Sequence, residues 1–458
     1  MRLTLLCCEA VLAMLVTGQI DVPALSAFSA ADTQGYPGQM VSKEAMKLNK
    51  QGLDHLKKKQ YDEAIRLFRE ALNIQPDFPD ALNNLGKALE SIGKDDEAIS
   101  DFDKALKLAP ENANIHYNKG VALFHEERFE EAIASYRKAI EIHEDFTEAQ
   151  NGLGAALFSL GRTDEAISAF RKVIQLDPKN TDALNNLGTA LMTQHKAEEA
   201  IPFFHKAHKL RPNLVEIHEN YANALGEAGR KEEAIAAYVI LVSKHPAQPG
   251  AWAHLGHLLY ISKRYDKASV ALKKSLELKQ DQPEVALTLG LAQYDQGKTS
   301  DAIRSFEQSL SLKPDDFHAL CGLGSAYYAK KDYAKAEASY QKALIQKPDS
   351  PEALAGLGAT QLASEQSDEA IATYQKLIPL EPDNPDNQLN EGTALFKKGR
   401  FRDAAESYRE AIRLKPDLAR AHYNLGMALL RLNDTNSAKA EFEQAHRLDS
   451  SLNPPVGR

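Results

Sequence analysis

Cysteine is scarce in this sequence, with three in 458 residues. Cys7 and Cys8 are adjacent near the start and Cys321 stands alone, so no spacing indicates a disulfide framework or a zinc site. Runs rich in lysine and arginine are also missing, and the formal net charge is −9. Because nucleic-acid binding needs a basic surface that neutralises phosphates, the composition argues against a nucleic-acid partner.

Motifs that would indicate catalysis are missing as well. The sequence has no Gly-x-Ser-x-Gly segment and no Cys/His constellation. Glycine pairs occur in residues 151–154, 321–324 and 355–358, but they lie within predicted helices with no strand before them. They therefore do not indicate phosphate-binding loops. The sequence predicts a protein that is not an enzyme and needs no cofactor.

Long hydrophobic runs are limited to the N-terminus. Residues 3–16 are apolar apart from Thr4 and Glu9, and small residues follow at 26–32. This order predicts a signal peptide over residues 1–31, a linker over 32–44, and export to the periplasm or the medium. The apolar segment is too short for a stable membrane span. The alternatives are a disordered tail, a wrongly assigned start codon, and a cytoplasmic protein if Glu9 prevents export.

A repeat of 34 residues organises the rest of the sequence. The segment DALNNLG occurs at 80–86 and again at 182–188, which is 102 positions or three periods later. Position 20 of all twelve repeats is alanine, position 8 is glycine in eleven, with Ala222 as the exception, and position 32 is proline in nine. The register is unbroken over residues 45–452, and 453–458 form a tail. The predicted repeats are 45–78, 79–112, 113–146, 147–180, 181–214, 215–248, 249–282, 283–316, 317–350, 351–384, 385–418 and 419–452.

Each repeat predicts two helices joined by a turn. Apolar residues recur three and four apart, as in residues 183–191 and 198–210. Proline at position 32 ends the second helix, because it lacks the N–H that would continue the helix. Proline also opens five of the first helices, where that N–H has no partner in any case. Glycines between the two helices are expected to adopt the left-handed conformation that ends the first helix: Gly93, Gly161, Gly229, Gly297 and Gly399.

This pattern resembles the tetratricopeptide repeat family, whose signature is a small residue at position 8, Ala at 20, an aromatic residue at 24 and Pro at 32. Position 24 is aromatic in every repeat except the seventh, which has Leu272. The resemblance covers residues 45–452 and implies an all-α, right-handed α-solenoid of twelve helix-turn-helix repeats. It also implies that the first helices line a concave groove for extended peptides, with positions 2, 5, 6, 9 and 12–13 facing it.

Six asparagines at position 6 are the first candidate binding residues. They resemble the asparagine ladder of the superhelical repeats of O-linked N-acetylglucosamine transferases, which grips a peptide backbone. Gly152, His254, Thr288, Gly322 and Gly356 interrupt the ladder. The alternative is that asparagine is an exposed filler on these helices. The six candidates are Asn84, Asn118, Asn186, Asn220, Asn390 and Asn424.

Repeats 6–9 contain the second candidate, an aromatic patch with Trp252, His254, His257, Tyr260, Tyr294, Tyr327 and Tyr328. His254 and His257 are three residues apart, as are His205 and His208, but neither pair has an adjacent carboxylate, so no metal site is predicted. Position 2 is acidic in seven repeats. These acids form either a rim that favours a basic ligand or favourable first-turn charges on helices.

Together these features predict a non-enzymatic scaffold that binds protein or peptide partners. Two alternatives remain open. One is a periplasmic scaffold of a polysaccharide-secretion or cell-envelope assembly, and the other is a substrate-presenting subunit of a separately encoded glycosyltransferase. The last repeat has no capping helix after it, so Phe442 is expected to be partly unprotected and to support a homo- or hetero-oligomer.

Overall fold

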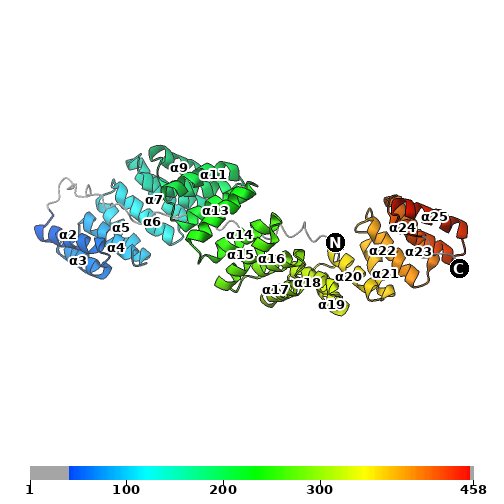
Figure 1. The fold of residues 1–458 in the computed structure, drawn as a ribbon. Coiled ribbons are helices and arrows are strands. Elements are labelled where there is room, and N and C mark those ends of the chain that lie inside the picture. The colour runs from blue at the N-terminus through cyan, green and yellow to red at the C-terminus, as the bar shows by residue number, and fades with distance from the viewer. Residues whose placement is uncertain (1–40, 454–458) are drawn as a thin grey trace. The chain divides into compact units, whose positions relative to one another are not determined.

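A computed structural model describes residues 41–453, in which every regular element is a helix. The predicted signal peptide lies outside the described residues. Figure 1 shows the helices in chain order. Their bounds are α2 Lys43–Lys57, α3 Tyr61–Ile74, α4 Pro79–Glu90, α5 Asp95–Leu108, α6 Ala113–His125, α7 Phe129–Ile142, α8 Thr147–Ser159, α9 Thr163–Leu176, α10 Thr181–Thr193, α11 Ala197–Leu210, α12 Val215–Glu227, α13 Lys231–Lys244, α14 Pro249–Ile261, α15 Tyr265–Leu278, α16 Pro283–Asp295, α17 Thr299–Leu312, α18 Phe317–Ala329, α19 Tyr333–Gln346, α20 Pro351–Ala363, α21 Ser367–Leu377, α22 Pro385–Lys397, α23 Phe401–Leu414, α24 Ala419–Arg431 and α25 Thr435–Leu448.

Each predicted repeat contains one even-numbered first helix and one odd-numbered second helix, so the expectation of an all-α solenoid of twelve repeats is confirmed. The turn between the two helices has a left-handed residue at position 15 of every repeat. The five predicted glycines adopt this conformation, with φ between 73° and 77°. The other seven repeats use a residue with a side chain there, although such residues adopt positive φ at a cost of roughly 1–2 kcal/mol. These seven are Lys59, Glu127, His195, Lys263, Lys331, Glu365 and Asn433.

Small residues let the two helices of a repeat approach closely. The alanine at position 20 has no exposed surface in any of the twelve repeats. The glycine at position 8 faces the aromatic ring at position 24 of its own repeat. A Cβ added to Gly86, for example, would lie 2.6 Å from the ring of Phe102. The sequence period therefore records a repeated contact between a ring and a helix backbone.

The same ring also fixes the distance to the next repeat. A Cβ added to Gly152, at position 6, would lie 2.7 Å from the ring of Tyr136 in the preceding repeat. Gly322 lies equally close to Phe306 of its preceding repeat. The glycines that interrupt the asparagine ladder are thus packing residues, and the mid-helix glycine pairs place one glycine against each of two successive rings.

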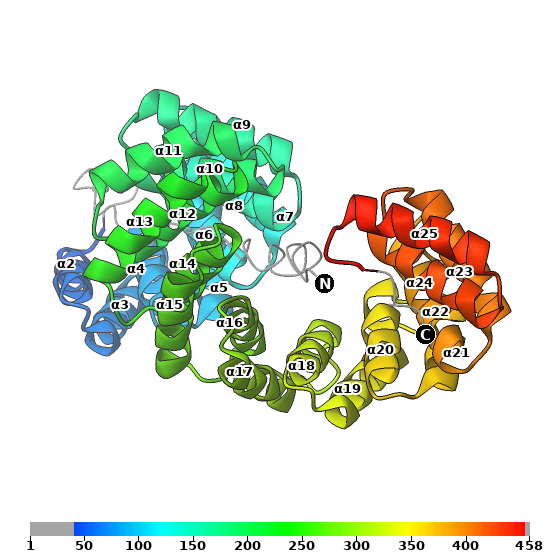
Figure 2. The same cartoon turned by 45° about the vertical axis from the view of Figure 1, so that its right-hand side comes forward.

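The described helices form two compact units, residues 41–241 and residues 242–453. Within each unit, every second helix packs on the first helix of the next repeat, and successive first helices also contact one another. Successive second helices do not pack on one another to a comparable extent among the described residues. Figure 2 shows this alternation, for example along α16 to α20. The first helices therefore form the inner side of each unit and the second helices the outer side.

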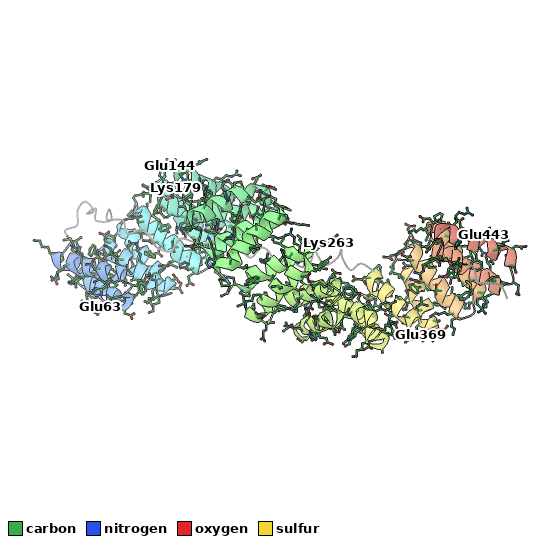
Figure 3. All side chains as sticks on the ribbon, viewed as in Figure 1. Glu63, Glu144, Lys179, Lys263, Glu369 and Glu443 are labelled. Atoms are coloured by element: carbon green, nitrogen blue, oxygen red, sulfur yellow. The ribbon has the colours of Figure 1, made fainter. Side chains whose placement is uncertain are left out.

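Charged side chains cover the outer side, as Figure 3 shows for Glu63, Glu369 and Glu443. Ion pairs connect neighbouring second helices, as between Arg69 and Glu97 at 3.4 Å, but both side chains are about half exposed. Exposed pairs contribute little to stability, roughly 0–1 kcal/mol each. The solenoid is therefore stabilised mainly by its apolar contacts. No described helix is long and apolar enough to span a bilayer.

The prediction that Phe442 is partly unprotected is wrong. Phe442 is only 4% exposed, and its ring packs edge-on against Tyr423, with 5.4 Å between the ring centroids. The reason is that α24 of the same repeat covers the ring, with Gly426 leaving room for it. Oligomerisation through this repeat stays a prediction.

Replacing Gly322 by alanine should destabilise the protein by about 1–3 kcal/mol, because the new methyl group overlaps the buried ring of Phe306. Gly250 is the matched control within the same unit, since nothing lies within 4 Å of its added Cβ. Gly250→Ala should be neutral or stabilising by about 0.5–1 kcal/mol, because alanine favours helix. Urea unfolding followed by circular dichroism measures both. Equal effects of the two substitutions would contradict the packing role of Gly322.

Candidate partner-binding surface

The inner side of each unit has buried and accessible rows of side chains. Position 6 is buried in repeats 2 to 5, because it lies between one first helix and the repeat before it. Positions 2 and 13 are half-buried or exposed in every repeat, and position 12 is half-buried in most. The accessible inner surface is therefore formed mainly by positions 2, 12 and 13, with position 9 partly accessible.

Four candidate asparagines in the unit of residues 41–241 make the same contact. Each donates a side-chain N–H to the asparagine carbonyl at position 5 of the preceding repeat. The N···O distances are 3.0 Å from Asn84 to Asn49, 2.8 Å from Asn118 to Asn83, 3.3 Å from Asn186 to Asn151, and 3.0 Å from Asn220 to Asn185. The asparagines thus connect successive first helices through amide contacts, of which three are buried and that of Asn220 is partly buried. Their predicted contact with a peptide stays a prediction.

Asn390 and Asn424 have a different environment. Asn424 donates to the Thr393 hydroxyl at 3.5 Å, and it also lies beside the Tyr408 hydroxyl. Asn390 lies beside the hydroxyl of Tyr374. Burial raises the pKa of both tyrosines, and the asparagines oppose that rise. Asn220, Asn390 and Asn424 are half-buried, so these three keep accessible surface, whereas Asn186 has none.

The structure brings only part of the predicted aromatic patch together. Tyr260, Tyr294 and Tyr327 pack against one apolar cluster around Phe306. Tyr328 is 40% exposed and its ring packs against Tyr333, with 5.8 Å between the centroids. Tyr260, Tyr294 and Tyr328 occupy position 12 of three successive repeats and therefore form a row on the inner side.

Trp252 and Tyr327 have other contacts. The indole N–H of Trp252 donates to the carbonyl of Pro246 at 2.9 Å, so this side chain braces the loop before its own helix. The Tyr327 hydroxyl donates to Glu307 at 2.8 Å. Tyr327 also lines a pocket between helices α17 to α19. These contacts are structural features of the repeat junctions.

The two histidine pairs are packed within the repeats. Burial, together with the neighbouring His257, lowers the pKa of His254 to about 4. Burial also lowers the pKa of His257, and neither of its ring nitrogens has a hydrogen-bond partner. His208 packs against His218 with 4.3 Å between ring centroids, and His205 packs against Tyr221 at 5.5 Å. All four imidazoles therefore pack against neighbouring side chains, and burial favours the neutral form of His254 and His257.

Acidic groups along the inner side are partly dehydrated. Burial raises the pKa of Glu352, and burial together with Glu216 raises that of Glu219. Glu216 also accepts a hydrogen bond from Asn185 at 3.4 Å, so this position 2 acid touches the preceding repeat. Burial therefore disfavours the charged form of both carboxylates. A cationic ligand would favour that form.

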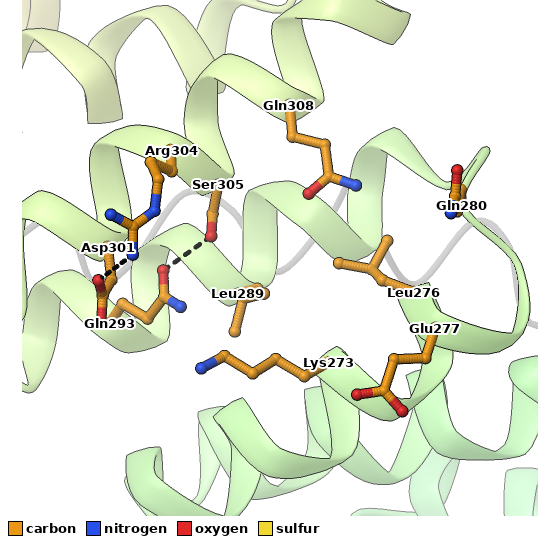
Figure 4. A pocket seen from close by; sticks show the side chains of 10 residues that line it. All are labelled: Lys273, Leu276, Glu277, Gln280, Leu289, Gln293, Asp301, Arg304, Ser305 and Gln308. Atoms are coloured by element: carbon orange, nitrogen blue, oxygen red, sulfur yellow. Dashed lines mark hydrogen bonds and ion pairs between the residues drawn. The ribbon is translucent and has the colours of Figure 1, made fainter.

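Pockets between repeats lie on the outer side. Figure 4 shows one, lined by residues of α15, α16 and α17. Its wall includes Gln293, which accepts a hydrogen bond from the Ser305 hydroxyl at 2.7 Å. Similar pockets recur at the junctions of α3 with α4 and α5, and of α17 with α18 and α19. Because they recur at equivalent junctions, they are a consequence of the repeat packing.

Sequence reasoning missed a third set of inner residues, at positions 12 and 17 of one repeat and 13 of the next. Positions 12 and 17 form ring pairs in several repeats, such as Phe124 with Phe129 and Phe396 with Phe401. The side chain at position 13 of the next repeat can contact such a ring pair. Arg431, for example, lies over the Phe401 ring, 5.4 Å from its centroid. Repeat 2 has Glu90 and Asp95 in place of the two rings. A comparison of these three positions across the repeats would have revealed this set.

Family profiles match most of the described chain. The profile described as the C-terminal domain of cilia and flagella-associated protein 70 matches residues 144–355. Four tetratricopeptide repeat profiles match elsewhere, at 49–113 and 93–145, 327–388, 392–433 and 419–452. A search of curated proteins finds no significant match.

Three of the solved structures that match this chain illustrate the range of similarity. The APC/C hetero-tetramer Cut9–Hcn1 is 15% identical over 90% of this chain and 94% of that chain, with a TM-score of 0.42. MamA is 29% identical over 35% of this chain and 94% of its own, with a TM-score of 0.33. YrrB, described as a TPR protein with an unusual peptide-binding site, is 24% identical over 40% of this chain and 95% of its own, with a TM-score of 0.38. These TM-scores are too low to support an inference about partners.

Replacing Asn186 by alanine should reduce stability by about 1–3 kcal/mol, because the substitution removes a buried amide and its hydrogen bond to Asn151. Asn220→Ala should cost less, since Asn220 is half-buried and water can replace its contact. Unfolding free energies of the two variants, measured in urea, test this order. A negligible effect of Asn186→Ala would show that the buried asparagine bonds do not stabilise the solenoid.

Acid should destabilise the unit of residues 242–453 as the pH falls from about 6.5 to about 4. In this range the unfolded chain binds a proton at His254 that the folded chain excludes, with an upper limit of roughly 3 kcal/mol. His254→Asn should reduce the difference between the melting temperatures at pH 7 and pH 4.5. The matched control His446→Asn, at an exposed position of the same unit, should leave that difference unchanged. Equal responses of both variants would rule out this role for His254.

Proposed function

The chain is a tetratricopeptide repeat protein with the architecture of a protein-interaction scaffold, and we propose that it is non-enzymatic and binds extended peptide segments along the inner side of its first helices. The observation that carries this proposal is the row of Tyr260, Tyr294 and Tyr328 at one position of three successive repeats. Tyrosines at regular spacing offer apolar contact area with little loss of side-chain entropy on binding.

The charge of the same side favours a basic partner. Position 2 is acidic in seven repeats, and burial raises the pKa of Glu352, which disfavours its charged form. A lysine or arginine in the bound segment would favour that form while its neighbours contact the tyrosine row. We therefore propose that the partner segments combine basic and aromatic residues.

The asparagines have two roles in this proposal. The buried ones connect successive first helices and so hold the binding positions at fixed distances. Those with accessible surface, Asn220, Asn390 and Asn424, are placed to exchange hydrogen bonds with a peptide backbone, since an amide both donates and accepts. A rigid receptor of this kind loses little entropy when a ligand binds.

Panning a random-peptide display library on the whole chain should enrich basic, aromatic sequences. Binding of an enriched peptide, measured by fluorescence anisotropy, should weaken by about tenfold or more in Tyr328→Ala, the size expected for an aromatic contact at an interface. It should also weaken with added salt.

The matched control is Ile345→Ala, which removes a large side chain that is 74% exposed on the second helix of the same repeat. This control should leave affinity unchanged. Equal affinities of wild type and Tyr328→Ala, or a library without enrichment, would contradict the proposed binding side.

A further inference from the structure

Three ligating side chains from two successive repeats meet in the unit of residues 41–241. Glu90 ends α4, Asp95 begins α5, and His125 ends α6. The Nδ1 atom of His125 lies 3.3 Å from Glu90 Oε1 and 3.7 Å from Asp95 Oδ1. One ligating atom from each residue lies within 4.8 Å of the other two. Residues up to 35 positions apart in sequence thus form one compact cluster of nitrogen and oxygen ligands.

The place of this cluster in the repeat makes it unusual. In repeats 3 and 11 the positions of Glu90 and Asp95 are occupied by two aromatic rings, with centroids 5.3 and 5.2 Å apart. Repeat 2 therefore has two carboxylates where repeats 3 and 11 have an apolar contact. Two acids in such a place repel each other and lose hydration, which disfavours the folded state unless a cation compensates.

The carboxylates of Glu90 and Asp95 also have little contact with water. The Glu90 side chain is 9% exposed and the Asp95 side chain 10% exposed. Asp95 Oδ1 is directed at the cluster and accepts no hydrogen bond. Two nearly buried carboxylates therefore lie against a single imidazole, that of His125.

We propose that Glu90, Asp95 and His125 form a binding site for a divalent cation, with Zn²⁺ as its ion. Zinc takes imidazole nitrogen and carboxylate oxygen at about 2.0–2.2 Å in tetrahedral geometry, which places neighbouring ligand atoms about 3.4 Å apart. The two distances from His125 are close to that value. A mixture of one imidazole and two carboxylates favours zinc over magnesium or calcium, which prefer oxygen alone.

The site has an open side. The His125 side chain is 42% exposed, whereas both carboxylates are buried, so an ion would enter past the imidazole. Three protein ligands leave one tetrahedral position for water or for a group of a bound partner. Because the ligands come from α4, α5 and α6, the ion would also cross-link repeats 2 and 3. This inference rests on the ligand cluster alone and does not depend on the proposed peptide binding.

Zinc binding to the whole chain, stripped with a chelator, tests the proposal. Competition with a chromogenic chelator should show that wild type binds one Zn²⁺ per chain. Each of Glu90→Gln, Asp95→Asn and His125→Asn should weaken the affinity for Zn²⁺ by at least about tenfold. Co²⁺ added in place of zinc should give the visible absorption of a tetrahedral complex, and the three substitutions should remove it. Added zinc should raise the melting temperature of wild type but not that of the three variants.

His195→Asn is the matched control. His195 Nδ1 also lies 3.3 Å from a carboxylate, that of Glu227, but its side chain is 90% exposed and has only this one partner. The control should bind zinc as wild type does. Glu90→Gln and Asp95→Asn remove a repulsion, so both should remain folded, which circular dichroism verifies. Zinc binding that is absent from wild type, or equal in wild type and all three variants, would overturn the site.

Discussion

The contact between an aromatic ring and helix backbone is the constraint on which this solenoid depends. The ring at position 24 packs against position 8 of its own repeat and position 6 of the next, so it determines two distances at once. Tyr136, for example, lies against both Gly120 and Gly152. Because a well-packed interior tolerates little change in volume, both positions need small or carefully placed side chains. The strict 34-residue period follows from repeating this contact.

That constraint also determines which residues are available for binding. Positions 5 and 6 lie between neighbouring first helices, where Asn186 bonds to Asn151 and Gly322 makes room for Phe306. Positions 2, 12 and 13 point away from the junction and vary freely in chemistry. The tyrosine row of repeats 7–9 uses position 12, and the cluster of Glu90, Asp95 and His125 uses positions 12, 17 and 13. Repeats with one common packing thus carry different surfaces.

The sequence by itself determined the architecture. Each repeat contact is local or joins adjacent repeats, so the helical spacing, the position 8 glycines and the position 20 alanines predict helix pairs and their stacking. The five turn glycines and the opening prolines were also predictable, because their backbone preferences do not depend on distant residues. Seven further left-handed residues, such as Lys263, were not predictable, since their conformation is imposed by the packing of the two helices.

Only the tertiary structure decided which side chains meet across repeats. The packing of successive first helices brings Asn84 and Asn118 into contact with asparagines 35 residues earlier, and no sequence pattern gives the geometry of that packing. Phe442 is buried within its own repeat, because α24 covers it. Glu90, Asp95 and His125 are unremarkable acids and an imidazole in the sequence. They become one site because the packing angle between repeats brings three helix ends together, and that angle is set by side-chain volumes in the core.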